Sequence, residues 1–126
     1  MPHITIEYSA NVAAHHDIDA LVEAVHGAAL EHGLASLAAL RTRAAERSAY
    51  RIATGDDRFG FVAIAVRIGP GRDLALKQSF IETLLDAAEQ AVRPSPLAVA
   101  WSIELTEIDP ELRINRNGVR TALEAD

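Results

Sequence analysis

Pro2 is the residue of this sequence best suited to carry a reactive atom. It follows the initiator Met1 and precedes the alternating run His3-Ile4-Thr5-Ile6-Glu7-Tyr8, which predicts a strand. We expect methionine aminopeptidase to remove Met1, because a small residue follows it. The new terminus is then a secondary amine held in a ring. Such an amine can act as a general acid or base if its surroundings lower a pKa that starts at about 8 or above. The alternative is that Pro2 only protects the terminus from degradation.

Three arginines are candidates for binding an anionic substrate. Arg72 ends the glycine-rich turn Gly69-Pro70-Gly71, where backbone N–H groups and a following helix N-terminus favour anions. Arg41 and Arg43 are two residues apart in a predicted strand, so they share one face. A guanidinium binds a carboxylate through two parallel hydrogen bonds. The alternatives are a solvated arginine in a surface turn for Arg72, and pairing with a neighbouring acid for Arg41 or Arg43.

The five histidines do not predict a metal site. His15 and His16 are adjacent and precede Asp17, which suits a helix cap better than a chelate. His26 and His32 are six residues apart, and no His-Glu-x-x-His pattern is present. His3 follows Pro2 and is a possible secondary site residue, although ordinary packing is the simpler expectation. We therefore expect neither a metal nor any other cofactor.

Composition limits the classes of protein that this chain can represent. The 126 residues predict one domain, 1–126, and 49% hydrophobic with 24% charged residues favours a globular fold. A net charge of −6 disfavours nucleic-acid binding, which needs a basic face. The chain has no cysteine, no apolar run long enough to span a bilayer and no signal-peptide pattern. We expect a cytoplasmic protein that binds neither nucleic acid nor membrane.

The first half of the chain predicts a β-α-β unit. After the strand at residues 3–8, Asp17 can cap a helix that runs to about His32, and Gly33 stands where a C-terminal glycine belongs. Its apolar stripe consists of Ile18, Leu21, Val22, Val25 and Ala29. Residues 38–47 then predict a second strand.

The second half repeats this pattern. Residues 61–66 form an apolar run typical of a strand covered on both faces, and Asp73 can cap a second helix. The expected stripe of that helix is Ile81, Leu84, Leu85, Ala88 and Val92. Pro94 and Pro96 end the helix, and residues 99–106 alternate as a fourth strand, with Trp101 on its apolar side. After Pro110 we expect an irregular piece or short strand, and a helical turn near Thr121.

The fold class predicted by this order is α+β, with the element sequence β-α-β-β-α-β. Two duplicated β-α-β units can form one four-stranded sheet with both helices on one face. The helices leave the other face of the sheet uncovered. Because that face includes apolar positions, we expect it to pack against another surface.

The sequence resembles the amino-terminal proline tautomerases and, within them, the 5-carboxymethyl-2-hydroxymuconate isomerase family. The resemblance runs nearly end to end and rests on Pro2-His3 with the strand after it and on residues 40–43, 68–72 and 101–105. It implies a tautomerase-like fold and a homotrimer with sheets packed against one another. It also implies that Pro2 is catalytic and that Arg41 and Arg72 bind substrate, with Arg43 a second choice.

The function implied by this resemblance is a cofactor-independent proton shift. The expected substrate is 5-carboxymethyl-2-hydroxymuconate, an unsaturated tricarboxylate of homoprotocatechuate breakdown, or a related dicarboxylate. One alternative is another tautomerase, acting on a 4-oxalocrotonate- or phenylpyruvate-like substrate. Two others are a non-catalytic trimeric binding protein and a plain ligand-binding domain. The polar residues 115–120 could close a neighbouring subunit's site or form a solvated loop.

Overall fold

The computed structural model describes residues 2–125, and its elements follow the predicted order. The first unit consists of β1 (His3–Ser9), α1 (Ala10–His15), α2 (Ile18–His32), a 3₁₀ turn η1 (Leu37–Ala39) and β2 (Arg41–Arg47). The second unit and the tail consist of β3 (Phe59–Ile68), α3 (Leu74–Ala91), β4 (Ala98–Glu107), a 3₁₀ turn η2 (Pro110–Leu112) and α4 (Gly118–Ala125).

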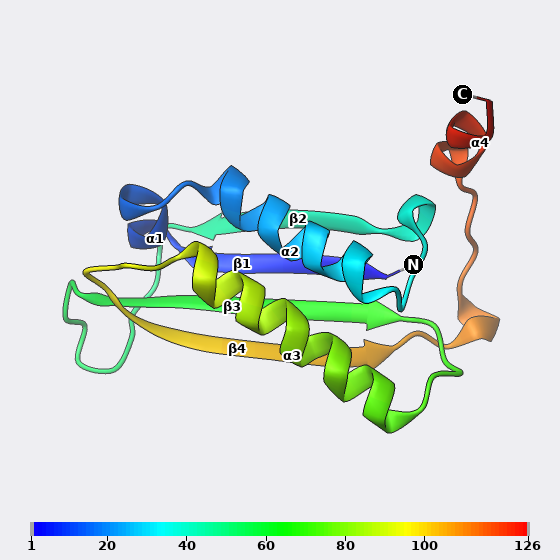
Figure 1. The fold of residues 1–126 in the computed structure, drawn as a ribbon. Coiled ribbons are helices and arrows are strands. Elements are labelled where there is room, and N and C mark those ends of the chain that lie inside the picture. The colour runs from blue at the N-terminus through cyan, green and yellow to red at the C-terminus, as the bar shows by residue number, and fades with distance from the viewer. Residues whose placement is uncertain (1, 126) are drawn as a thin grey trace.

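The four strands form one mixed sheet in the order β2-β1-β3-β4. Each unit contributes a parallel pair, β1 with β2 and β3 with β4, and β1 joins the two units by running antiparallel to β3. Helices α2 and α3 lie side by side across one face of the sheet (Figure 1). The predicted α+β class with two helices on one face is therefore confirmed.

Both long helices begin at the residues that the sequence predicted. The Asp17 carboxylate accepts a hydrogen bond from the Ala20 backbone N–H at 3.3 Å, and α2 ends at Gly33 with a left-handed φ of 84°. The Asp73 carboxylate accepts from the Leu76 N–H at 2.8 Å. These caps define where the two helices begin, and the Asp73 cap therefore places Arg72 just before α3.

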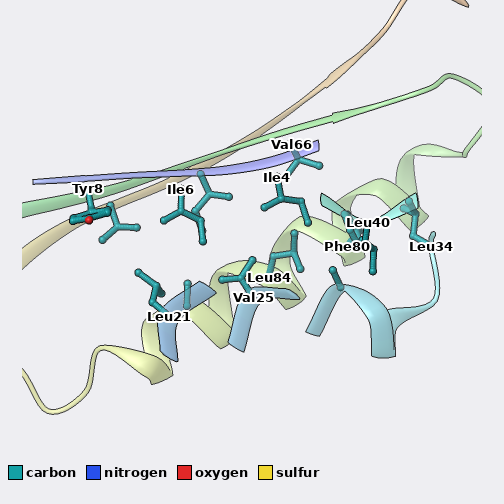
Figure 2. Packing of buried hydrophobic residues seen from close by; sticks show 14 of the residues in the cluster. Ile4, Ile6, Tyr8, Leu21, Val25, Leu34, Leu40, Val66, Phe80 and Leu84 are labelled. Carbon is teal, nitrogen blue, oxygen red and sulfur yellow. The ribbon is translucent and has the colours of Figure 1, made fainter. Parts of the chain in front are cut away.

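The hydrophobic core lies between the sheet and the two helices. Ile4, Ile6 and Tyr8 point from β1 toward Leu21 and Val25 of α2 (Figure 2). In α3 the buried residues are Phe80, Leu84 and Ala88, which are spaced four positions apart and so lie on one face of the helix. The predicted stripe of α3 omitted Phe80, which is fully buried, whereas Leu85 is not in the core cluster. The helix is thus rotated slightly from the predicted orientation.

The opposite face of the sheet is uncovered within one chain. Thr5, Ala45, Ala63, Ala65 and Ser102 line a hollow of about 330 Å³ on this face. The charged residues Glu7, Arg47 and Glu104 line the same hollow. Trp101 points away from this hollow and packs against the core, as its place in the alternating strand predicted.

Two parts of the chain differ from the prediction. Helix α1 was not predicted, since it is only six residues long and has no side-chain cap. Strand β2 begins at Arg41 rather than at residue 38, because Leu37–Ala39 forms the 3₁₀ turn. After Pro110 the tail forms a 3₁₀ turn and an irregular piece, and α4 confirms the helical turn predicted near Thr121. No helix among residues 2–125 has the length and apolar character needed to cross a membrane.

Candidate active site

Pro2 lies at the end of the sheet where several loops meet. The register pairs His3 with Arg41 on one side and with Arg67 on the other, so one residue earlier Pro2 lies beside Leu40 and Ile68. The Pro2 ring is fully buried. Leu34 and Leu40 pack close to Phe80 at this end of the core, which gives the site an apolar wall (Figure 2). Met1, whose removal we expect, lies outside the described residues.

A cavity of about 330 Å³ lies at this end of the sheet. Its walls come from the loop after α2, the 3₁₀ turn η1, the turn after β3, and the tail. The lining residues are Leu34, Ala35, Ser36, Ala39, Gly69, Pro70, Arg72, Arg113, Asn115 and Arg120. Ala39 precedes Leu40 and Gly69 follows Ile68, so the two strands that flank Pro2 both lead into this cavity. We call it the arginine pocket.

The arginine pocket is strongly cationic in an acidic protein. Arg72, Arg113 and Arg120 line it, and no Asp or Glu does so among residues 2–125. The ion pairs formed within the same residues involve other cations, namely Arg47, Arg58, Lys77 and Arg93. Three arginines gathered without a carboxylate partner form a site that an anion would neutralise.

Arg72 lines the pocket from the turn between β3 and α3. It follows Gly71, whose φ of 116° only glycine adopts readily, and it precedes the Asp73 cap of α3. Its Nη2 donates a hydrogen bond to the Leu34 carbonyl oxygen at 3.2 Å, which holds the partly buried side chain across the loop that follows α2. The remaining guanidinium N–H groups are available for a carboxylate.

Arg41 and Arg43 do not line the arginine pocket. The His26 imidazole from α2 bonds the Thr42 hydroxyl at 2.8 Å, so Thr42 faces the helices. Its neighbours Arg41 and Arg43 therefore face the uncovered side of the sheet. Within one chain the two predicted substrate-binding arginines, Arg41 and Arg72, lie on different surfaces. The sequence did not predict this separation.

His3 lies on the uncovered face beside these arginines. Arg43 Nη1 is 3.1 Å from His3 Nδ1. Burial lowers the pKa of His3, and the positive charges of Arg43, Arg67 and Arg41 lower that pKa further. The end of the uncovered face nearest Pro2 is thus a second cationic surface.

His16 and His32 have structural partners. His16 Nε2 bonds the Ser95 hydroxyl at 2.8 Å, and His32 Nε2 bonds the Ser79 hydroxyl at 3.0 Å. Burial, followed by the charge of His15, lowers the pKa of His16. Across residues 2–125 no group of three or more His, Cys, Asp or Glu side chains is placed to hold a metal ion.

The tail contributes Arg113, which sequence reasoning missed, and residues of the range 115–120, which it had considered for the site of a neighbouring subunit. Asn117 Nδ2 donates to the Ala38 carbonyl oxygen at 2.9 Å, and Asn117 Oδ1 accepts from the Arg120 backbone N–H at 3.1 Å. This anchor brings Arg113 and Arg120 to the pocket of their own chain. Residues 115–120 are therefore not merely a solvated loop. The only sequence signal was a tail rich in arginine, and no periodic pattern identified Arg113.

Comparison with known proteins agrees with this geometry. The sequence pattern of the family described as 5-carboxymethyl-2-hydroxymuconate isomerase matches residues 2–123. This chain belongs to that family. A relative from Escherichia coli, 5-carboxymethyl-2-hydroxymuconate Delta-isomerase, is 30% identical over 122 residues, covering 94% of this chain and 96% of the relative.

Solved structures show the same fold as this 5-carboxymethyl-2-hydroxymuconate isomerase family member. A crystal structure of a 5-carboxymethyl-2-hydroxymuconate delta-isomerase superposes with a TM-score of 0.88 at 21% identity, covering 98% of this chain and 93% of that one. A fused 4-OT symmetric trimer superposes with a TM-score of 0.64 at 18% identity, covering 88% and 91%. The tautomerase-like fold is confirmed by these superpositions.

Proposed function

We propose that this protein isomerises 5-carboxymethyl-2-hydroxymuconate by moving a proton, without a cofactor. Membership of the family supports this substrate, and the arginine pocket is the observation that carries the proposal. The substrate is a tricarboxylate, and the pocket gathers several arginines with no acid among its described lining residues. It lies where β2 begins and β3 ends, the two strands that flank Pro2, although Pro2 itself is not one of its lining residues.

Pro2 is the proposed general base and general acid. Removal of Met1 converts its nitrogen from an amide into a secondary amine. The apolar wall near Leu34, Leu40 and Phe80, together with the neighbouring guanidinium groups, disfavours the protonated amine and so keeps it available as a base. The neutral nitrogen takes the proton of the 2-hydroxyl group and returns it to a carbon of the conjugated chain.

Arg72 is the proposed partner of the substrate carboxylate nearest the reacting atoms. Its anchor on the Leu34 carbonyl fixes one edge of the guanidinium, so the rest can bind a carboxylate with little further ordering. As the dienolate forms, its negative charge grows close to this cation. General acid–base catalysis supplies roughly 10²–10⁴-fold, and positioning with electrostatic stabilisation supplies the remainder.

The proposed active form is a homotrimer. The uncovered sheet face needs a partner, and a trimeric protein shares the fold. In such an assembly Arg41 lies at a subunit interface, because it shares a face with His3 rather than with the core. We propose that Arg41 completes the site of an adjacent copy and that Arg43 holds His3.

Ultraviolet spectroscopy of the conjugated dienol tests the activity. Processed protein is expected to convert 5-carboxymethyl-2-hydroxymuconate faster than 2-hydroxymuconate and a phenylpyruvate enol. Arg72→Ala should lower kcat/KM about 100-fold or more, as for loss of one charge-stabilising donor. Arg58→Ala, a cation paired with Asp56 and outside the pocket, is the control. Faster turnover of 2-hydroxymuconate or of the phenylpyruvate enol would show that the proposed substrate is wrong. Absence of turnover with all three compounds would reject the proposed activity.

A further inference from the structure

We propose that Arg113 determines specificity by binding the carboxylate that distinguishes a tricarboxylate from a dicarboxylate substrate. This inference rests on the proposed function, because it concerns a ligand of the same pocket. It adds to that function a residue of the tail, and it assigns the preference for the more highly charged substrate to one side chain.

Arg113 lies against the turn that follows β3. A Cβ atom added at Gly69 would be 2.8 Å from Arg113 Nη1 and 2.9 Å from Nη2. The guanidinium thus occupies the space that the missing side chain leaves free. Only a glycine at position 69 allows this approach, so the turn and the tail together fix where the positive charge lies.

The Arg113 guanidinium has its donors available. Among residues 2–125 it has no hydrogen-bond acceptor and no carboxylate partner, although the residue is partly buried. By contrast, Arg72 bonds the Leu34 carbonyl, and Arg120 Nη2 lies 3.5 Å from the Ser36 hydroxyl. Among the described residues the Arg113 nitrogens are not buried polar atoms left without a partner, so they are open to the pocket and can donate to a ligand with several acceptor oxygens.

The positions of Arg72 and Arg113 suit them to bind two different carboxylates of one ligand. Arg72 is held on the side of Leu34, whereas Arg113 is held on the side of Gly69. One carboxylate cannot use both guanidinium groups fully if each binds in its bidentate geometry. A ligand with two carboxylates in this pocket can do so, and it also offsets the repulsion between the cations. A third carboxylate then remains for Arg41 of an adjacent copy.

Kinetics with two matched substrates test the inference. 5-Carboxymethyl-2-hydroxymuconate and 2-hydroxymuconate differ by one carboxymethyl group. Arg113→Ala is expected to lower kcat/KM for the tricarboxylate about 10- to 100-fold, the size of one lost charged hydrogen-bond pair, and that for the dicarboxylate less than about 3-fold. Arg116→Ala is the control, since Arg116 is an exposed arginine of the same tail that does not line the pocket. Equal loss for both substrates, or no loss, overturns the inference.

A second variant moves the charge instead of removing it. Gly69→Ala places a methyl group where the Arg113 guanidinium lies, so this flexible side chain must shift. The substrate preference should fall in the same direction as with Arg113→Ala. Gly69→Ala with the full tricarboxylate preference would contradict the proposed position of the guanidinium.

Equilibrium binding separates this inference from the proposed function. By calorimetry, wild-type protein and Arg116→Ala should bind propane-1,2,3-tricarboxylate at least about 10-fold more tightly than glutarate, and Arg113→Ala should lose that preference. If the preference is present but no dienol is converted, the proposed function fails and the anion site remains. If dienols are converted but the preference is absent or survives in Arg113→Ala, the inference about Arg113 fails.

Discussion

Arg43 Nη1 lies 3.1 Å from His3 Nδ1, next to the strand position of Pro2. A guanidinium can only donate, so His3 Nδ1 accepts and the ring proton lies on Nε2. This hydrogen bond therefore requires the neutral imidazole. Protonation would break this hydrogen bond and add a positive charge beside Arg43, Arg67 and Arg41, in agreement with the lowered pKa of His3.

The first prediction concerns the pH dependence of stability. Because the folded pKa of His3 lies below its ordinary value of 6.5, the unfolded chain binds the proton more readily than the folded chain. The contribution of His3 to the free energy of unfolding is complete above pH 6.5 and is lost as the pH falls through the folded pKa. Denaturant titrations from pH 7.5 to pH 5, together with an NMR titration of the ring, measure this loss.

The matched variant for this prediction is His3→Gln, which can accept a hydrogen bond from Arg43 but does not titrate. It should show a smaller loss of stability on acidification than the wild type. His16, whose pKa is also lowered, remains in both proteins and supplies the shared part of the pH dependence. Identical pH profiles for the two proteins, or a His3 pKa above 6.5, would contradict the assignment.

The second prediction is that active sites are shared between subunits. Arg41→Ala protein has intact Pro2, whereas protein with a blocked terminus has intact Arg41, and each alone should be nearly inactive. Unfolding and refolding an equal mixture should restore activity at about a quarter of the sites, since each restored site needs one chain of each kind. No recovery in properly assembled mixtures would mean that Arg41 acts in its own chain or not at all.

The third prediction concerns the cap that positions Arg72. Asp73→Ala removes the acceptor for the Leu76 N–H and should lower the free energy of unfolding by about 0.5–2 kcal/mol. Asp73→Asn retains an acceptor oxygen and should lose only a small part of that energy. Chemical denaturation at fixed protein concentration measures both. Equal destabilisation by the two variants would show that the negative charge, rather than the cap, is responsible.

The sequence predicted the elements whose signals are local. The stripe of α2, the caps Asp17 and Asp73 and the alternation of β1 and β4 each specify an element through neighbouring residues. Helix α1 escaped prediction because it has one turn and a half and no cap. The order of elements then predicted the sheet, since parallel pairs joined by helices have few alternative arrangements.

The candidate site was only partly predictable for the same reason. Arg72 could be placed because a glycine-rich turn and a helix cap surround it. Arg113 reaches the pocket through the tail, whose position depends on the Asn117 contact with Ala38, almost eighty residues away in the chain. The separation of Arg41 from Arg72 follows from the face of β2 that Thr42 presents to α2, which residue spacing alone does not define.

The central claim is that a free Pro2 nitrogen performs the proton transfer. Turnover of 5-carboxymethyl-2-hydroxymuconate should be compared for protein that begins at Pro2 and protein that retains Met1 or an acetyl group there, with the terminus verified by intact mass. We predict rapid conversion by the first form and a loss of at least about 100-fold in the second, as for removal of a general base. Equal rates for the two forms would show that another group moves the proton.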